Sequence, residues 1–255
     1  LLVGTALVFG GNIGTQQEHT DRQAIPETRG ILRGEAFGTT WSVTLRQPGL
    51  ATDALEQRLS ERLEQIESQL SHWRPQSETA QFNASATTFE VDVSPELMEL
   101  LRFGEQLNHA THGAFDLTVA PLIDLWGYGP SRRTVAPTDA EIAAALKLVG
   151  QDRVVLAADF PAIRKTDPEV RIDLGALIQG YAADQLATIL KDAEIAEFLI
   201  DVGGELRAGG TWKVAIEDPR RSDQPLLTLT LTDGALATSG IYRQGPNGTP
   251  QTRHI

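Results

Sequence analysis

The chain has 255 residues, of which 41% are hydrophobic and 22% charged, which is enough apolar material for one large domain or two small ones. Its net charge of −12 argues against a nucleic-acid partner, because an acidic surface repels phosphate backbones. It contains no cysteine, which excludes disulfides, thiolate metal sites, a cysteine nucleophile and a lipid-modified cysteine within these residues.

The first thirty residues do not read as part of the fold. Leu1 to Gly10 form an uncharged apolar run that is too short to span a bilayer and resembles the end of a signal peptide. The stretch that follows, up to residue 30, is polar and reads as a tether. We therefore interpret 1–30 as a signal-peptide remnant and tether, and expect export to the periplasm. The alternative is that the apolar run is an artefact of the expressed sequence.

A strand and a long helix are predicted first in the globular part. Trp41, Val43 and Leu45 alternate with polar residues, which is typical of a strand with one buried face. Asp53 is expected to begin the helix, with Glu56 three residues later as a capping box. The apolar positions of this helix fall on one face: Leu55, Leu59, Leu63, Ile66 and Leu70.

A second strand and another helix come next. Phe89, Val91 and Val93 alternate with acidic residues and predict a strand. Ser94 and Pro95 supply the N-cap and the first-turn proline of a helix. This helix should end near Gly113. Its inward side is expected to consist of Leu97, Leu100, Leu101, Gly104 and Leu107.

The remaining elements complete the prediction of fold class. Thr138 and Glu141 form a capping box for a helix whose Ile142, Leu146 and Val149 should face inward. Further along come a helix over 179–190 and strands over 198–202, 214–216 and 227–231. Because strands and helices are mixed without strict βαβ alternation, the sequence predicts an α+β fold with mixed sheets.

Five segments rich in Gly, Pro and polar residues lie between these elements, where sites usually form: 71–78, 113–130, 171–181, 201–205 and 237–240. Asp173 precedes a glycine turn and a helix start, which could seat a phosphate or, through oxygen ligands, Mg²⁺. Trp73, Phe115 and Tyr128 could sandwich a flat ring. Taken singly, these aromatic residues and glycines also fit an ordinary core and ordinary turns.

Motifs of the common nucleotide and metal enzymes are missing. The sequence has no P-loop, no His-Glu-x-x-His zinc helix and no nucleophile elbow. His109 and His112 lie three apart near the end of a helix, and could bind a metal. We favour a role as positive charge at the helix C-terminus.

Together, the segments resemble the ApbE family of flavin transferases over residues 35–255. The matching stretches, each weak alone but specific in their order, are 37–39, 73–78, 82–83, 113–118, 121–130, 173–184, 201–205, 216–219 and 237–240. The resemblance implies one mixed-sheet, T-fold-like α+β domain over 31–255.

The resemblance also implies an activity. Members transfer FMN from FAD to a Thr or Ser hydroxyl of a partner protein, forming a phosphodiester bond and releasing AMP. Mg²⁺ on the pyrophosphate would neutralise charge, which suits an acidic protein. The implied partner is an acceptor flavoprotein with a short Thr- or Ser-containing flavinylation motif, often in a membrane-bound redox complex.

Several cofactor contacts carry over by position. Phe37 stands where the family often has Met, and Trp73 where it often has Tyr, and both should touch the flavin or adenine ring. Ala114, Phe115 and Asp116 resemble adenosine contacts.

The catalytic and metal positions carry over in the same way. Asp173 should hold the cofactor beside the metal, and Ala176 should give a backbone carbonyl to Mg²⁺. Gln179 takes a cofactor-contacting position that is usually Lys or Glu, which removes a charge near the phosphates. His254 resembles the histidine of the family's His-x-x-Asp-Pro-x-Thr-Gly motif and is a candidate to help deprotonate the acceptor hydroxyl. The alternative for His254 is a loop residue beside the metal.

The chain stops at Ile255, inside that last motif. The Asp and Thr that would complete the Mg²⁺ site are not among these residues, and we expect the protein to continue. Two other functions stay open. One is an FAD pyrophosphatase with water as the nucleophile, and the other is a non-enzymatic periplasmic protein that binds or delivers FAD.

Overall fold

The computed structural model of the chain describes residues 6–7, 29–218 and 221–239. They belong to two compact units, the first formed by residues 1–64 with 179–255 and the second by residues 65–178. Two long helices, α1 (Asp53–Leu70) and α6 (Gly175–Asp192), contribute residues to both units. Within the described ranges we find no helix with the length and apolar character that a bilayer crossing requires.

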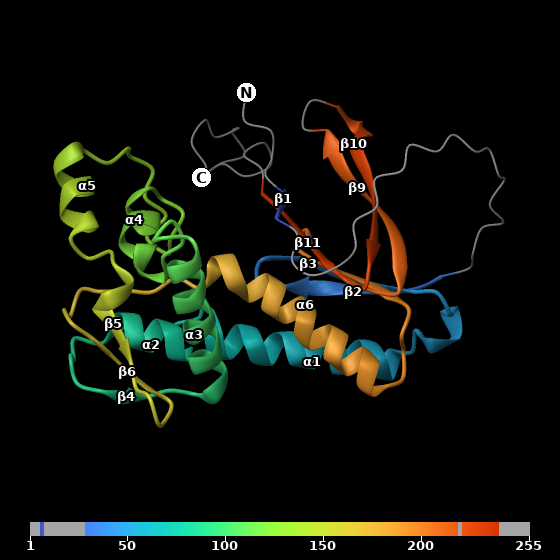
Figure 1. Ribbon diagram of the computed structural model, residues 1–255, viewed down its shortest axis with the longest axis horizontal. Helices are drawn as coiled ribbons and strands as arrows, with labels where there is room; N and C mark the ends of the chain where they lie inside the picture. The colour runs from blue at the N-terminus through green and yellow to red at the C-terminus, as the bar shows by residue number, and fades with distance from the viewer. Residues whose placement is uncertain (1–5, 8–28, 219–220, 240–255) are drawn as a thin grey trace. The chain divides into compact units, whose positions relative to one another are not determined.

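The first unit is built on a six-stranded sheet with the order β1-β11-β8-β7-β3-β2 (Figure 1). Each neighbouring pair of strands is antiparallel. The strands are β1 (Ala6–Leu7), β2 (Gly30–Ala36), β3 (Thr39–Leu45), β7 (Phe198–Val202), β8 (Glu205–Gly209) and β11 (Ala235–Thr238). The predicted strand around Trp41 is confirmed as β3, with Trp41, Val43 and Leu45 all buried.

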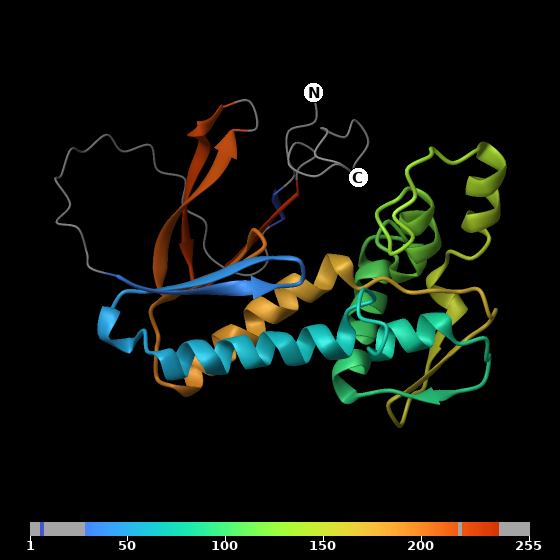
Figure 2. The same ribbon diagram turned by 180° about the vertical axis from the view of Figure 1, so that it is seen from behind.

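The halves of α1 and α6 that belong to this unit lie side by side along one face of the sheet (Figures 1 and 2). A hydrogen bond of 2.9 Å from the guanidinium of Arg62 to Gln185 Oε1 joins them. The predicted apolar faces are confirmed, since Leu59 and Leu63 of α1 and Leu186 of α6 are fully buried. Burial of these leucines is the main free-energy gain that holds the helices on the sheet.

A hairpin of two longer strands, β9 (Thr211–Asp218) and β10 (Arg221–Thr232), completes the first unit. Trp212 of β9 lies in a buried cluster that the hairpin shares with β8 and β11, and its indole N–H donates to the carbonyl of Gly209 at 2.8 Å. The cluster comprises Ala208, Trp212, Val214, Leu231 and Leu236.

The second unit is mainly helical, with a small antiparallel sheet of order β4-β6-β5. Its elements are α2 (Glu78–Ala84), β4 (Val91–Asp92), α3 (Pro95–Ala110), η2 (Leu117–Val119), α4 (Ala120–Leu125), α5 (Asp139–Leu146), η3 (Gln151–Arg153), β5 (Val154–Leu156) and β6 (Ala162–Lys165). The predicted caps are confirmed: Ser94 caps α3, and Thr138 with Glu141 forms a capping box on α5.

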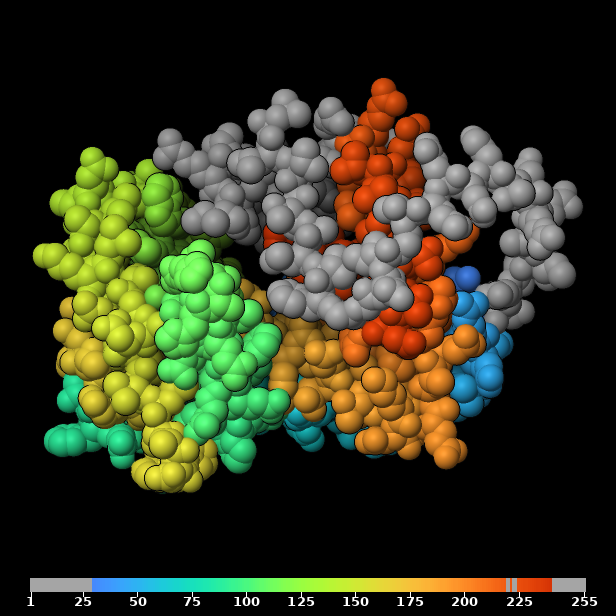
Figure 3. All heavy atoms as spheres, in the orientation of Figure 1, coloured from blue at the N-terminus to red at the C-terminus, as the bar shows by residue number. Residues whose placement is uncertain are grey.

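Three local predictions were wrong. The helix α1 begins at Asp53 as predicted, but its cap is Thr52, whose hydroxyl accepts the N–H of Leu55 at 3.2 Å, so the predicted capping box of Asp53 and Glu56 is wrong. Phe89 is 82% exposed, because β4 is a two-residue edge strand that begins after it. Leu146 is 53% exposed, and α5 has no buried residue because it lies at the outer surface of its unit (Figure 3).

The α+β class is confirmed, and the sheets differ from the prediction in one respect. Every strand pair within the described ranges is antiparallel, so these sheets are not mixed in strand direction. Hairpins join β2 to β3 and β7 to β8, and the tight turns between these neighbouring strands make them antiparallel.

Candidate functional site

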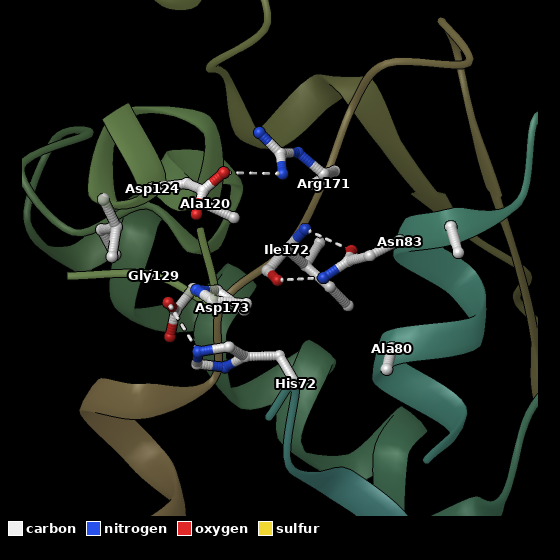
Figure 4. Close-up of a pocket in the computed structure, with 12 residues that line it drawn as sticks. His72, Ala80, Asn83, Ala120, Asp124, Gly129, Arg171, Ile172 and Asp173 are labelled. Carbon is white, nitrogen blue, oxygen red and sulfur yellow. Dashed lines mark hydrogen bonds and ion pairs between the residues drawn. The ribbon is translucent and has the colours of Figure 1, made fainter. Parts of the chain in front are cut away.

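A cavity of about 230 Å³ opens in the second unit (Figure 4). Polar side chains from the loop before α2, from α2, from α4 and from the segment before α6 line it: His72, Asn83, Asp124, Arg171 and Asp173. Small residues of α2 and α4, Ala80 and Ala120 among them, leave room between these polar groups. The lining combines a guanidinium, an imidazole and two carboxyl groups, which suits a charged polar ligand.

Asn83 fixes the segment that carries Asp173. Its side-chain amide donates to the carbonyl of Ile172 at 2.8 Å, and its amide oxygen accepts the N–H of Ile172 at 2.8 Å. The N–H of Asp173 in turn donates to the carbonyl of Leu117 at 2.8 Å. These bonds satisfy buried backbone groups outside any sheet and hold the segment in one position.

Asp173 itself is only 8% exposed and lies at the beginning of α6. Its Oδ1 accepts the N–H of Gly175 at 2.5 Å, and its Oδ2 lies 3.7 Å from Nε2 of His72. A carboxylate is favoured at the positive end of a helix dipole. Since the carboxylate of Asp173 already occupies this end of α6, the position presents negative charge and fits a cation better than a bare phosphate.

Arg171 brings a positive charge to the same cavity. Its guanidinium donates to Oδ2 of Asp124 at 3.3 Å, and the N–H of Ser131 donates to the other oxygen of that carboxylate at 2.9 Å. Burial alone would raise the pKa of Asp124. The hydrogen bonds from Ser131 and the charge of Arg171 outweigh burial, so this pKa lies below its usual value. Asp124 is therefore ionised at neutral pH and holds Arg171 in place.

Trp73 follows His72 in a compact loop before α2. Ser77 closes this loop, since its hydroxyl donates to the carbonyl of Ser71 at 2.7 Å and accepts the N–H of Ala80 at 3.0 Å. Trp73 is 46% exposed, its ring centroid lies 5.3 Å from that of His72, and the guanidinium of Arg132 lies 5.8 Å from it. A large exposed ring beside a cation is suited to stacking with a flat anionic ligand.

The loop with Ala114, Phe115 and Asp116 leads into η2. Oδ1 of Asp116 accepts both the N–H of Thr118 at 2.7 Å and the hydroxyl of Thr118 at 2.6 Å. The backbone of this loop reaches Asp173 through the bond to Leu117. The structure thus brings the loop next to Asp173, while adenosine contacts of Ala114, Phe115 and Asp116 stay a prediction.

Two predicted positions lie in the first unit. Phe37 forms the turn between β2 and β3 together with Gly38, and both have positive φ, of 54° and 69°. Gln179 lies against the turn between β7 and β8: a Cβ placed on Gly203 would be 2.9 Å from Nε2 of Gln179 and 2.9 Å from Cγ2 of Thr39. The absence of a side chain at Gly203 therefore gives Gln179 its room.

Glu205, on the far side of the same turn, pairs with Val202 in the β7–β8 hairpin. Burial, and secondly the negative charge of Asp201, raise the pKa of Glu205 to about 7. A carboxyl group that titrates near neutrality is often part of a functional site. The sequence prediction included this segment but assigned Glu205 no role.

The predicted metal and base positions are less complete. Ala176 is exposed in the first turn of α6, and His254 lies outside the described residues. Within the described ranges we find no group of three His, Asp or Glu side chains placed to hold a metal. Magnesium in proteins often has only one or two carboxylate ligands, the rest being waters and substrate phosphates, so the single carboxylate of Asp173 fits such an ion.

Sequence reasoning did not single out His72, Arg171 or Asp124. His72 and Arg171 lie in segments that it marked as unexplained by the fold, but Trp73 and Asp173 were chosen from them. The signal that could have identified them is their charge inside Gly- and Pro-rich segments of an acidic chain.

Comparison with known proteins gives consistent results. Residues 37–255 match the ApbE family. A protein of Vibrio cholerae named FAD:protein FMN transferase is 34% identical over 224 residues, covering 83% of this chain and 66% of that protein. A protein of Klebsiella pneumoniae with the same name is 32% identical over 227 residues, covering 85% of this chain and 65% of that protein. The chain thus spans just under two thirds of the length of these curated relatives.

Solved structures agree in fold. The flavin transferase ApbE from Vibrio cholerae superposes with a TM-score of 0.77 at 33% identity, covering 86% of this chain and 74% of that one. The apo form of the flavinyl transferase ApbE from Pseudomonas stutzeri gives a TM-score of 0.75 at 31% identity, covering 85% of this chain and 69% of that one.

Proposed function

The chain belongs to the ApbE family, and we propose that it transfers FMN from FAD to a Thr or Ser hydroxyl of a partner protein. The observation that carries the proposal is the continuous family match over residues 37–255, which includes the cavity around Asp173. The name FAD:protein FMN transferase, borne by similar proteins of Vibrio cholerae and Klebsiella pneumoniae, supports the same activity.

The proposed reaction exchanges one phosphorus–oxygen bond for another. The hydroxyl oxygen of the acceptor bonds to the phosphorus next to the flavin, the anhydride bond breaks, and AMP leaves with the bonding electrons. The hydroxyl proton passes to a base, for which His254 is our candidate. Most of the rate gain in phosphoryl transfer comes from holding the two reacting groups in line, so the rigid placement of Asp173 matters.

We assign Mg²⁺ to the carboxylate of Asp173, with the carbonyl of Ala176 as a second proposed ligand. When bound, the ion would neutralise the pyrophosphate and stabilise charge that builds up during transfer. The low exposure of Asp173 and its position beside Arg171 in one cavity support a site for a phosphate-bearing ligand with a cation.

Other residues are proposed to bind FAD by its rings and phosphates. Trp73, with Arg132 beside it, offers a surface for a ring, and Arg171 offers positive charge. Phe37 and Gln179 are two further proposed cofactor contacts. The proposed acceptor is a flavoprotein with a Thr- or Ser-containing flavinylation motif, as part of a membrane redox complex in the periplasm.

The decisive experiment is mass spectrometry of an acceptor flavoprotein that carries a threonine flavinylation motif and lacks flavin. It is incubated with this protein, FAD and Mg²⁺, and AMP is measured in parallel. We expect the acceptor to gain the mass of one FMN with one AMP released, and both to be lost with a chelator. The control is the acceptor with its target threonine replaced by alanine, which should gain no mass.

The other outcomes identify the alternatives. AMP release without any mass gain would overturn the transferase and indicate an FAD pyrophosphatase. Tight FAD binding with neither AMP nor mass gain would indicate a protein that binds or delivers FAD.

A further inference from the structure

A buried lysine lies behind the wall of the cavity. Lys165, the last residue of β6, is 1% exposed. Its Nζ donates to three backbone carbonyl oxygens, those of Pro168 at 3.1 Å, Val170 at 3.2 Å and Asn83 at 3.5 Å. The Nζ also lies 5.1 Å from the centroid of the Phe82 ring. Neutral carbonyls and a ring, rather than a carboxylate in direct contact, surround this charge.

Such a position is costly for an ammonium group. Burial lowers the pKa of Lys165, and the positive charge of Arg171 lowers it further, while the negative charge of Asp167 only partly offsets them. An apolar side chain would avoid this cost, although it would leave the three carbonyls without a donor. The role of Lys165 therefore lies in what its three hydrogen bonds hold together.

The three bonds join the two sides of one junction. Asn83 belongs to α2, while Pro168 and Val170 belong to the segment that leads to Asp173. Lys165 ties the main chain of Asn83 to the main chain of Val170. Two residues further along, the side chain of Asn83 bonds both backbone groups of Ile172, which directly precedes Asp173 (Figure 4).

We propose that Lys165 is a positioning residue for Asp173. Its ammonium group fixes the position of α2 relative to the 168–170 segment. The side chain of Asn83 can then form both hydrogen bonds to Ile172, which hold Asp173 in one position in the cavity. The consequence for catalysis rests on the proposed function, whereas the consequence for the rigidity of residues 168–174 does not.

The first test is hydrogen exchange measured by mass spectrometry on the whole chain. We expect peptides covering 168–174 to exchange about tenfold faster in Lys165→Met than in the wild type, and less than that in Lys165→Gln, which keeps a donor. Peptides of α3 should exchange at the wild-type rate. Lys147→Met, which removes an exposed lysine of the same unit, is the control and should change neither region.

The second test is the rate of FMN transfer. In Lys165→Met and Lys165→Gln we expect kcat to fall by about 10- to 100-fold, with a smaller change in KM for FAD, because misplacing a catalytic group by about 1 Å has effects of this size. Asn83→Ala should give a similar loss. The double variant Lys165→Gln with Asn83→Ala should be no slower than the slower single one, because both act through Ile172.

Unchanged exchange over 168–174 in folded Lys165 variants would overturn the proposal, as would wild-type kcat or losses that multiply with Asn83→Ala. If Lys165→Met does not fold, the Lys165→Gln and Asn83→Ala pair decides the question. If the wild type itself transfers no FMN, the proposed function fails, and the exchange measurement alone decides whether Lys165 fixes the segment.

Discussion

Nε2 of His72 lies 3.7 Å from Oδ2 of Asp173, and both side chains are largely shielded from solvent, at 13% and 8% exposure. The imidazole comes from the loop before α2 and the carboxylate from the start of α6. The other carboxylate oxygen accepts the N–H of Gly175. Oδ1 of Asp173 therefore stabilises the backbone at Gly175, whereas Oδ2 faces His72 in the cavity.

This division predicts different outcomes for two substitutions of Asp173. Asp173→Ala should reduce FMN transfer at least about 100-fold and weaken FAD binding, because the cavity loses its proposed metal ligand. It should also cost about 1 kcal/mol of unfolding free energy, since the N–H of Gly175 loses its acceptor. Transfer rates and urea unfolding measure the two effects.

Asp173→Asn separates the effect on FMN transfer from the effect on stability, because it keeps an oxygen that accepts the N–H of Gly175 and removes the charge. We expect nearly wild-type stability with the same loss of transfer. Asp159→Asn, at an exposed position of the same unit, is the control and should transfer at the wild-type rate. Normal transfer by Asp173→Asn would contradict the assignment of Asp173 to the metal.

Trp73 is predicted to contribute to binding and little to stability, because nearly half of its side chain is exposed. Trp73→Ala should weaken FAD binding by about 1 kcal/mol, roughly fivefold in Kd, through loss of a stacking surface. Trp73→Phe should recover most of this affinity, because it restores an aromatic ring. Titration of flavin fluorescence measures the affinity, and equal Kd values for all three proteins would rule out a ring contact at Trp73.

Glu205 predicts a pH dependence of stability. Its pKa is raised from the ordinary 4.5 to about 7, first by burial and then by Asp201. Between these two values the folded protein holds a proton that the unfolded chain has released, so the contribution of Glu205 to stability falls as pH rises from about 4.5 to 7. Above pH 7 the loss is complete, and below 4.5 there is none.

Glu205→Gln removes this titration. We expect the variant to be more stable than the wild type at pH 8 by about 1 to 2 kcal/mol, a range reduced for partial exposure of the group, with little difference at pH 4.5. Urea unfolding at the two pH values measures it. Glu35→Gln, on an exposed position of β2, should change neither value. A stability difference that does not depend on pH would show that Glu205 titrates normally.

Replacing glycine by alanine should have opposite effects on stability at two helical positions. A Cβ on Gly104 of α3 would overlap Cδ1 of Leu117, so Gly104→Ala should cost about 1 to 3 kcal/mol by overpacking. A Cβ on Gly180 of α6 meets no described atom within 4 Å, so Gly180→Ala should gain up to about 1 kcal/mol from helix propensity. Denaturant unfolding tests both, and a stabilised Gly104→Ala would mean that Leu117 moves freely.

Much of the secondary structure could be predicted from the residues themselves. The apolar face of α1, the Ser94 cap of α3 and the capping box of Thr138 all depend on residues within a few positions of one another. Local spacing determines such features, because a helix repeats every 3.6 residues and a strand every two. It failed at Phe89 and Leu146, since whether an apolar residue is covered depends on which other element packs on it.

The order of motifs along the chain was also enough to indicate the family, and with it Asp173 as a candidate site residue. Only the tertiary structure decided what surrounds that residue. His72, Asn83 and Arg171 come from separate parts of the sequence and meet at the cavity, and Lys165 lies behind its wall. Hydrogen bonds from side chains to a distant backbone, such as Asn83 to Ile172, follow no periodic pattern, because any residue offers the same N–H and C=O. The sequence therefore determined the elements and the family, and the packing of loops against α2 and α6 determined the site.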